Sequence, residues 1–440
     1  MNNSVAGIKS VLLSWQGQTL PEGVPRVFDY GLLKDPSILT IVGPRRAGKT
    51  YLCYQIIRHL KAKGVPQQNL VFINAEDERL YPLHGDELTQ LWDSYQELLS
   101  PDAHQTIFFI IDEVQAFAHW SLWARRMQEQ QKGRVKLILT GSSSKLLSRE
   151  LATELRGRSL SVEIFPLSFG EWVRFKKLDP APRPAVLHSP QKNQYKKIFN
   201  LFFKDGGFPE LTQSAYKETL LQVYYKTMFA RDLIERFRIR QIPLFEDYLK
   251  LQLDQFSCRS TLTGLEGKLK ILNHQFSKNT LSKYYRAALD IYLIFELEAF
   301  SAKLKNRLKL ARKVYVIDQG LIQAIRFSVS EDDGRILENI IFLHLRRTRP
   351  ALFFYNGKRE CDFLVFEKNR CVEAIQVCWS LQNPDTRDRE IEGLIEAMDA
   401  FSVSHGTIVT ENEYEDLMIQ KRKIAVRPAW YYLLQRQIVT

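Results

Sequence analysis

Long apolar runs, paired cysteines and a secretory leader are all missing from this sequence of 440 residues. No apolar stretch approaches the roughly 18–20 residues that a helix needs to cross a bilayer. The start, Met-Asn-Asn-Ser-Val-Ala-Gly, has no basic region followed by an apolar one. The five cysteines are scattered without metal-site spacing, and their odd number fits a reducing compartment. We therefore expect a cytoplasmic protein without a membrane segment, a disulfide framework or a zinc site.

The chain also lacks the composition of a disordered or fibrous protein, because 45% of its residues are hydrophobic and 25% are charged. Its length allows two or three domains. The formal net charge is +12, so acids are in the minority. A basic balance of this size favours a polyanionic partner such as nucleic acid or an acidic membrane surface.

Short apolar runs alternate with stretches of helical periodicity in the first part of the chain. The periodic stretches include residues 52–63 and 118–131. The apolar runs are residues 38–43, 69–74, 106–111 and 135–140. Short apolar strands that are separated by helices are typical of a parallel sheet with crossover connections, so we predict an α/β fold.

A polar stretch with four prolines, residues 177–195, separates this part from the rest of the chain. The pattern is then helical from about 195 to 310, and strands return from about 335. These later strand-like runs are residues 352–355, 361–366, 372–377 and 407–410. We therefore predict three domains, at residues 1–190, 191–325 and 326–440.

An eight-residue segment matches the phosphate-binding pattern G-x-x-x-x-G-K-[ST] between a predicted strand and a predicted helix. It consists of Gly43, Pro44, Arg45, Arg46, Ala47, Gly48, Lys49 and Thr50. Backbone N–H groups of such a loop surround phosphate oxygens, its lysine contacts the β and γ phosphates, and its hydroxyl ligates Mg²⁺. We therefore predict a P-loop (Walker A) site for ATP and Mg²⁺.

The apolar run that begins near Ile107 ends in two carboxylates, Asp112 and Glu113. This pattern is typical of a Walker B strand, in which the aspartate holds the Mg²⁺ shell and the glutamate deprotonates the attacking water. A buried strand that merely ends in surface acids is the alternative. With the P-loop, the pattern predicts an ATPase in which Lys49 and Glu113 are catalytic and Thr50 and Asp112 serve the metal.

Polar residues farther along are candidates for contact with the γ-phosphate. Ser142 follows a predicted strand, where a small hydroxyl can contact that phosphate, although serines there are commonly turn formers. Arg156 and Arg158 are candidates for an arginine finger that acts on a neighbouring subunit, with surface ion pairing as the alternative. An arginine finger implies a homo-oligomer.

Further short motifs follow the nucleotide-binding motifs along the chain. They are Asp112-Glu113-Val114-Gln115, Thr140-Gly141-Ser142-Ser143-Ser144, Arg156-Gly157-Arg158, Phe165-Pro166-Leu167-Ser168-Phe169, Gly206-Gly207-Phe208-Pro209-Glu210, Arg231-Asp232-Leu233, Val314-Tyr315-Val316-Ile317-Asp318-Gln319-Gly320 and Leu337-Glu338-Asn339. This order resembles the prokaryotic AAA-type ATPases that carry a C-terminal domain of unknown function, from about residue 20 to the end. The resemblance implies an AAA-type P-loop ATPase core, a winged-helix-like middle domain and a terminal domain similar to PD-(D/E)xK restriction endonucleases.

Two segments of the middle domain are candidates for contact with DNA. Residues 277–280 resemble an N-cap, and the helix after them exposes Lys283 and Arg286 on one face. A second segment lies between the strand-like runs 295–300 and 313–317. Residues 301–313 contain Lys303, Lys305, Arg307, Lys309, Arg312 and Lys313 and no acid. Such a basic hairpin is typical of a DNA-contacting wing, and a wing that contacts only protein is the alternative.

The terminal domain departs from the nuclease pattern that the resemblance implies. Glu338 and Asp362 match its first carboxylates, but Gln376 and Cys378 stand where the E-x-K glutamate and lysine are expected. Metal-dependent cleavage needs anionic ligands and a group that manages the attacking water. We therefore expect a degenerate nuclease-like site that lacks an ammonium. Glu373 reaches it only if the strand register shifts by an odd number of residues.

Together these features predict an ATP-hydrolysing AAA-type protein that acts as an oligomeric motor on DNA, in translocation, remodelling or branch migration. One alternative is a nucleotide-dependent switch with a slow ATPase, which times a signalling or defence partner. A second alternative is an ATP-dependent nuclease.

Overall fold

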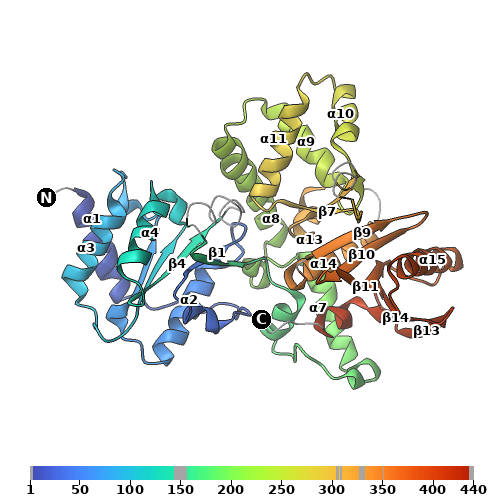
Figure 1. Ribbon diagram of the computed structural model, residues 1–440, viewed down its shortest axis with the longest axis horizontal. Coiled ribbons are helices and arrows are strands. Elements are labelled where there is room, and N and C mark those ends of the chain that lie inside the picture. The colour runs from blue at the N-terminus through green and yellow to red at the C-terminus, as the bar shows by residue number, and fades with distance from the viewer. Residues whose placement is uncertain are drawn as a thin grey trace. The chain divides into compact units, whose positions relative to one another are not determined.

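The computed structural model describes residues 3–142, 155, 157–303, 307, 310–326, 332–349 and 351–435. Its internal contacts divide the chain into two compact units, Met1–Phe165 and Pro166–Ile438. Figure 1 labels their helices and strands.

The first unit is built on a parallel sheet of five strands in the order β2-β3-β4-β1-β5. The strands are β1 (Ile38–Val42), β2 (Leu70–Asn74), β3 (Ile107–Asp112), β4 (Val135–Gly141) and β5 (Ser159–Glu163). Every residue of β1, β3 and β4 is buried, as parallel strands covered on both faces require. The predicted α/β fold is confirmed for this unit, and the first four strands lie where the apolar runs placed them.

Helices cover both faces of this sheet (Figure 1). They are α1 (Asn3–Gln16), α2 (Lys49–Ala62), α3 (Glu87–Leu99) and α4 (Trp120–Gln130). Successive strand residues belong to different hydrophobic clusters, because their side chains alternate between the two faces. Val71 packs with Ile8 and Leu91, whereas Phe72 packs with Ile56 of α2. Each fully buried aliphatic side chain stabilises the fold by roughly 1.5–3 kcal/mol.

The second unit begins with helices and a small antiparallel sheet of strand order β6-β8-β7. Its helices are α6 (Phe169–Phe175), α7 (Lys192–Asp205), α8 (Lys217–Thr227), the π-helix η8 (Met228–Glu235), α9 (Ile242–Asp254), α10 (Leu262–Ile271), α11 (Lys278–Asp290) and α13 (Gln319–Ile325). Its strands are β6 (Arg259–Ser260), β7 (Ile294–Glu298) and β8 (Arg312–Val316). The strands expected on either side of the basic segment are confirmed as β7 and β8.

The second unit ends in a mixed six-stranded sheet of order β13-β14-β12-β11-β10-β9. The elements are α14 (Asp333–Thr348), β9 (Ala351–Asn356), β10 (Glu360–Glu367), β11 (Arg370–Val377), α15 (Pro384–Phe401), β12 (His405–Thr410), β13 (Glu415–Ile419), β14 (Arg422–Pro428) and α16 (Ala429–Gln435). Leu394 and Met398 of α15 pack on Leu364 and Ile408 of the sheet. The four strand-like runs predicted near the C-terminus are confirmed as β9 to β12.

Short 3₁₀ helices connect several of these elements. They are η1 (Tyr30–Leu33), η2 (Gln67–Asn69), η3 (Glu78–Leu80), η4 (Val114–Ala116), η6 (Pro184–His188) and η7 (Pro209–Thr212).

Two quoted motifs of the second unit bind each other. Asp318 is the N-cap of α13, and its Oδ2 accepts a hydrogen bond of 2.6 Å from the backbone N–H of Gly207. Gly206 has φ 84°, and a Cβ there would lie 2.1 Å from Asp318 Oδ1. Burial raises the pKa of Asp318 to about 6. Gly206 is therefore accounted for by its positive φ and its tight packing against a buried carboxyl group.

Candidate functional site

The phosphate-binding segment turns between the end of β1 and the start of α2. A Cβ on Gly43 would lie 2.0 Å from the carbonyl oxygen of Ile164, so the close approach of the β5 end requires glycine. Gly48 has φ 95° and is the N-cap of α2. The segment therefore ends at a helix N-terminus, where the first N–H groups have no intrahelical acceptor and are suited to phosphate.

Lys49 lies within this loop and is only 5% exposed. Its Nζ donates to the carbonyl oxygens of Gly43 and Pro44, each at 3.1 Å. It also lies 3.3 Å from Glu113 Oε1. The two predicted catalytic residues are thus in direct contact with each other.

Asp112, at the carboxyl end of β3, binds the hydroxyl groups of Thr50 on α2 and Thr140 on β4. Thr50 Oγ1 donates to Asp112 Oδ2 at 2.6 Å, and Thr140 Oγ1 donates to Asp112 Oδ1. Burial raises the pKa of Asp112, and the two hydroxyl hydrogen bonds oppose that rise. The predicted metal ligands Thr50 and Asp112 therefore lie side by side, and both offer the oxygen atoms that Mg²⁺ prefers.

Glu113 is held by contacts with its backbone and with its side chain. Its φ of 55° is in the left-handed region, which costs a non-glycine residue roughly 1–3 kcal/mol. The backbone N–H of Glu113 donates a hydrogen bond of 3.0 Å to Thr140 Oγ1, and Gln115 Nε2 donates to Glu113 Oε2. Burial disfavours the charged form, but Lys49, Gln115 and Arg45 hold the pKa of Glu113 below its usual value. The carboxylate is therefore ionised and oriented.

Two residues that shape this site were missed by the sequence analysis. Thr140 begins the motif Thr140-Gly141-Ser142-Ser143-Ser144 and ends a predicted strand. Its place at the strand end could have indicated a residue of the nucleotide site. Arg26 had no such signal. It is 8% exposed, and its guanidinium donates to the carbonyl oxygens of Ala47 and Phe165, each at 2.7 Å. Arg26 thus supports the P-loop backbone from a segment without any recognisable pattern.

The other nucleotide-site candidates are placed less centrally. Ser142 follows directly after β4 and is buried at 4% exposure. Arg158 forms an ion pair with Glu129, and its side chain is 41% exposed. Arg156 lies outside the residues that the structure describes. The position of Arg158 at the surface is compatible with both alternatives, a finger or a surface ion pair.

The candidate DNA contacts divide into exposed and internally paired residues. Ser277 caps α11 through a hydrogen bond from the N–H of Thr280, and Lys283 and Arg286 are exposed on that helix. Arg307 instead lies 3.9 Å from a Glu298 carboxylate oxygen and over a phenylalanine ring. Lys303 is exposed. Lys305 and Lys309 lie outside the described residues.

The four residues of the predicted nuclease-like site line one cavity of about 750 Å³. They are Glu338, Asp362, Gln376 and Cys378. The N–H of Asp362 donates to Gln376 Oε1 at 3.2 Å. Our expectation that this site lacks an ammonium is wrong, because Lys313 of β8 lies 2.9 Å from Glu338 and 2.8 Å from Asp362. This ammonium comes from β8 of the small sheet and not from the position of Cys378.

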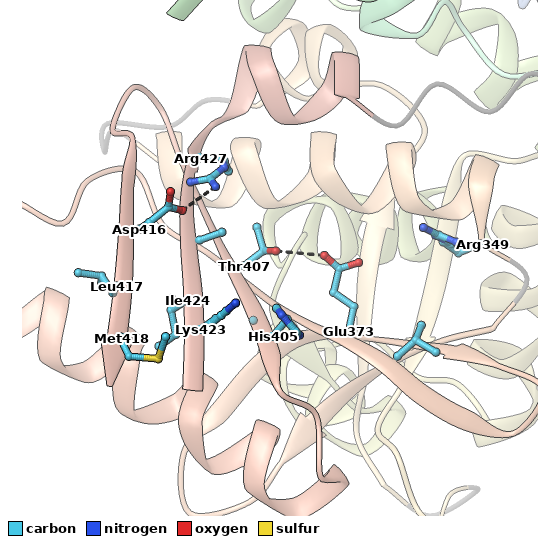
Figure 2. A pocket seen from close by; sticks show the side chains of 13 residues that line it. Arg349, Glu373, His405, Thr407, Asp416, Leu417, Met418, Lys423, Ile424 and Arg427 are labelled. Carbon is cyan, nitrogen blue, oxygen red and sulfur yellow. Dashed lines mark hydrogen bonds and ion pairs between the residues drawn. The ribbon is translucent and has the colours of Figure 1, made fainter. Parts of the chain in front are cut away.

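Glu373 belongs to a different pocket of the terminal sheet, shown in Figure 2. It accepts a hydrogen bond of 3.1 Å from Thr407 Oγ1, and Asp416 on β13 is paired with Arg427. This pocket has a volume of about 740 Å³ and is distinct from the cavity of Gln376. Glu373 and Gln376 therefore point to opposite faces of β11, as the spacing of three residues requires.

The described part of the chain contains no group of three or more His, Cys, Asp and Glu side chains placed to hold a metal ion. A Mg²⁺ ion at Thr50 and Asp112 would therefore need phosphate and water oxygens as further ligands, as is usual for this ion. Among the same residues, no helix is sufficiently long and apolar to cross a membrane.

Comparison with known proteins places family matches on both units. Residues 35–173 match the model of an AAA domain, and residues 197–332 match a domain of unknown function. The chain is 35% identical over 412 residues to an uncharacterized protein of Methanocaldococcus jannaschii, which covers 90% of this chain and 88% of the relative. An uncharacterized protein of Haemophilus influenzae is 24% identical over 401 residues, or 90% and 95% of the two chains.

Solved structures of AAA-type proteins are similar at a low level. The Aeropyrum pernix Orc1 protein in complex with DNA has a TM-score of 0.31 and 13% identity, over 69% of this chain and 94% of that one. Cdc6p from Pyrobaculum aerophilum has a TM-score of 0.27 and 13% identity, over 76% and 98%. AMPPCP-bound DnaA from Aquifex aeolicus has a TM-score of 0.27 and 12% identity, over 58% and 83%. At TM-scores this low, none of them assigns a function to this chain.

Proposed function

We propose that this chain, which belongs to the family of its Methanocaldococcus jannaschii relative and contains an AAA-type P-loop ATPase domain, binds ATP with Mg²⁺ and hydrolyses it. The observation that carries the proposal is the convergence of Lys49, Thr50, Asp112 and Glu113. The two motifs that contain them are more than 60 positions apart, yet Thr50 and Asp112 share a hydrogen bond of 2.6 Å and Lys49 and Glu113 an ion pair of 3.3 Å.

Nucleotide binding would use the loop and the first turn of α2. The backbone N–H groups of the loop after Pro44 would donate hydrogen bonds to the phosphate oxygens, and the Lys49 ammonium would exchange its carbonyl and carboxylate partners for phosphate oxygens. Thr50 and Asp112 would hold Mg²⁺, which supplies charge neutralisation at the phosphates when it is bound. Arg26 would keep the loop backbone in place during this exchange.

Hydrolysis would depend on Glu113 as the general base. Its side chain is ionised and tied to Gln115, so it can receive the proton of a water molecule placed for attack. Departure of Lys49 to the phosphates would remove one of the two donors that hold this carboxylate. Binding of the nucleotide and release of the base would thus be coupled through one ammonium group.

ATP hydrolysis by the purified full chain tests this proposal. Phosphate release should require Mg²⁺. It should stop when EDTA is added, because EDTA removes the ion that Thr50 and Asp112 would hold at the phosphates. The rate should be measured without DNA and with single-stranded, duplex and branched DNA. Tight ATP binding without any turnover, under every one of these conditions, would contradict an ATPase.

Thr140→Val is expected to lower turnover by roughly 10- to 100-fold with little change in the KM for ATP. The substitution keeps the side-chain volume but removes the hydroxyl that contacts Asp112 and the Glu113 N–H, and hydrogen bonds to charged groups contribute about 1.5–3 kcal/mol. Steady-state kinetics of both parameters check it. Thr140→Ser should stay within about twofold of the wild type, and full activity in Thr140→Val would exclude this positioning role.

We also propose that the middle of the second unit binds DNA as a winged helix. The elements α9, β6, α10, α11, β7 and β8 follow one another, and the sheet order β6-β8-β7 places the last strand centrally, as in winged helices. In this arrangement α11 is the recognition helix, and its exposed Lys283 and Arg286 would contact DNA. The half-buried Arg307 contributes less, because it already has an acidic and an aromatic partner.

Replacement of both Lys283 and Arg286 by alanine should weaken DNA binding equally for unrelated sequences. Each phosphate contact that is lost should also reduce the slope of log affinity against log salt by about 0.9 on duplex DNA. Fluorescence anisotropy at several salt concentrations measures both effects. Lys63→Ala with Lys226→Ala, at two other exposed lysines, is the matched control. An unchanged slope in the α11 variant would favour a protein-binding wing.

A homo-oligomeric motor on DNA, acting in translocation, remodelling or branch migration, combines these two activities. The Lys49–Glu113 ion pair favours a second candidate, a nucleotide-dependent switch, because it occupies both catalytic groups until nucleotide arrives. DNA-stimulated turnover together with a nucleotide-dependent increase in mass would support the motor. Slow turnover with about one ADP retained per chain would support the switch. Either way, Arg156 and Arg158 are the candidates for action on a neighbouring subunit.

A further inference from the structure

The ammonium group of Lys313 is surrounded by three carboxylates of the terminal domain. Its Nζ lies 2.9 Å from Glu338 Oε1, 2.6 Å from Glu360 Oε1 and 2.8 Å from Asp362 Oδ1. An ammonium has three N–H donors, so all of them are used at hydrogen-bond distance. Lys313 is 2% exposed, and the family-model match that contains it ends at residue 332, before any of these acids.

Each of these carboxylates is also held by a second donor of the protein. Tyr315 Oη donates to Glu338 Oε1 at 2.7 Å, and the N–H of Val377 donates to Asp362 Oδ2 at 2.9 Å. Arg259 of β6 pairs with Glu360. The cluster is therefore a completed hydrogen-bonded network in which a lysine fills the central cationic position.

The residue that follows Glu338 on α14 also binds β8. Asn339 is fully buried, and its side-chain amide donates to the Val316 carbonyl at 2.9 Å and accepts from the Val316 N–H at 2.8 Å. Two successive residues of the Leu-Glu-Asn motif on α14 thus bind β8 of the small sheet. A motif that resembles the start of a nuclease site is used here to attach one part of the second unit to another.

We propose that Lys313 is the resident cation of the terminal carboxylate cluster, and that it fastens the β6-β8-β7 sheet to the terminal sheet in place of a metal ion. Figure 1 shows β7 and β9 next to each other at this junction. The ammonium satisfies all three carboxylates, so the wild-type site does not take up a divalent ion. The middle and terminal parts consequently behave as one mechanical body. This inference does not depend on the ATPase activity.

The experiment compares full-length variants by thermal unfolding. Lys313→Met keeps the length of the side chain but leaves the carboxylates without their cation, and the loss of one partner from a buried ion pair is strongly destabilising. We expect the unfolding midpoint of the second unit to fall by roughly 10 °C. Adding Glu338→Gln and Asp362→Asn to Lys313→Met should recover at least half of that loss, because the two amides need no cation and Glu360 keeps Arg259 as its partner. Lys226→Met, at an exposed lysine, is the control.

A second measurement does not require Lys313→Met to fold. Mn²⁺ alone, followed by electron paramagnetic resonance, should bind the wild type and Asp362→Asn equally, since neither offers a free site at this cluster. Mn²⁺ binding to the wild type that disappears in Asp362→Asn would overturn the proposal. So would a triple variant no more stable than Lys313→Met, because the loss would then come from packing and not from unpaired carboxylates.

Discussion

Glu113→Gln is expected to lower ATP turnover by roughly 10²–10⁴-fold while MgATP still binds, because glutamine keeps the shape of the side chain but cannot take a proton. The structure adds a reason for unimpaired binding. Lys49 lies 3.3 Å from Glu113, so the phosphates must compete with this carboxylate for the ammonium. Removal of the negative charge weakens that competition. Affinity for ATP should therefore stay the same or increase.

Turnover and affinity have to be measured separately for this variant. Phosphate release gives the rate, and equilibrium binding of a fluorescent ATP analogue gives the affinity. Glu97→Gln is a suitable control, because Glu97 is an exposed acid paired with a surface lysine. If Glu113→Gln loses binding and turnover in equal measure, its role is structural or that of a metal ligand, and the assignment of the base must be abandoned.

The parts of the fold that could be predicted share a simple physical origin. Buried parallel strands are apolar on both faces, so β1 to β4 stand out as short continuous runs. The P-loop and Walker B motifs then follow from strand ends, where Lys49 and Asp112 must meet at one edge of the sheet. The strand β5 could not be found this way. Its residues Ser159–Glu163 are partly exposed at the sheet edge and carry polar side chains at alternate positions.

The parts that could not be predicted depend on contacts between distant residues. Arg26 supports the P-loop through two carbonyl groups, and no local pattern marks an arginine that binds carbonyl oxygens. Lys313 is one of several basic residues in its stretch, and the sequence could not single out the one that turns inward. Tertiary packing of β8 against α14 and β10 places it beside acids 25 and 49 residues away.

Lys313 also changes how the degenerate motif should be interpreted. The sequence indicates a site that has lost a carboxylate at Gln376 and an ammonium at Cys378. The structure shows Gln376 hydrogen-bonded to Glu390 of α15, and the ammonium supplied by β8. Similar charges are thus present in a different arrangement, in which the cation is part of the fold.

Lys49→Ala is expected to abolish hydrolysis and to weaken ATP binding, because the ammonium is the group placed to meet the β and γ phosphates. It should also have an effect without nucleotide. Glu113, whose side chain is only 13% exposed, would lose its cationic partner, and an unpaired buried carboxylate is destabilising. The apo protein should therefore unfold at a lower temperature. Adding Glu113→Gln should restore that midpoint without any return of activity.

These two outcomes separate the electrostatic role of Lys49 from its catalytic one. Thermal unfolding of the apo variants reports the ion pair, and phosphate release with equilibrium ATP binding reports the site. Lys61→Ala, an exposed lysine on the same helix, is the matched control for both measurements. Wild-type turnover in Lys49→Ala would show that the nucleotide is not bound in this loop. An unchanged unfolding midpoint in Lys49→Ala without nucleotide, by contrast, would mean that the Lys49–Glu113 pair does not stabilise the protein. The proposed coupling between nucleotide binding and release of the base would then be wrong.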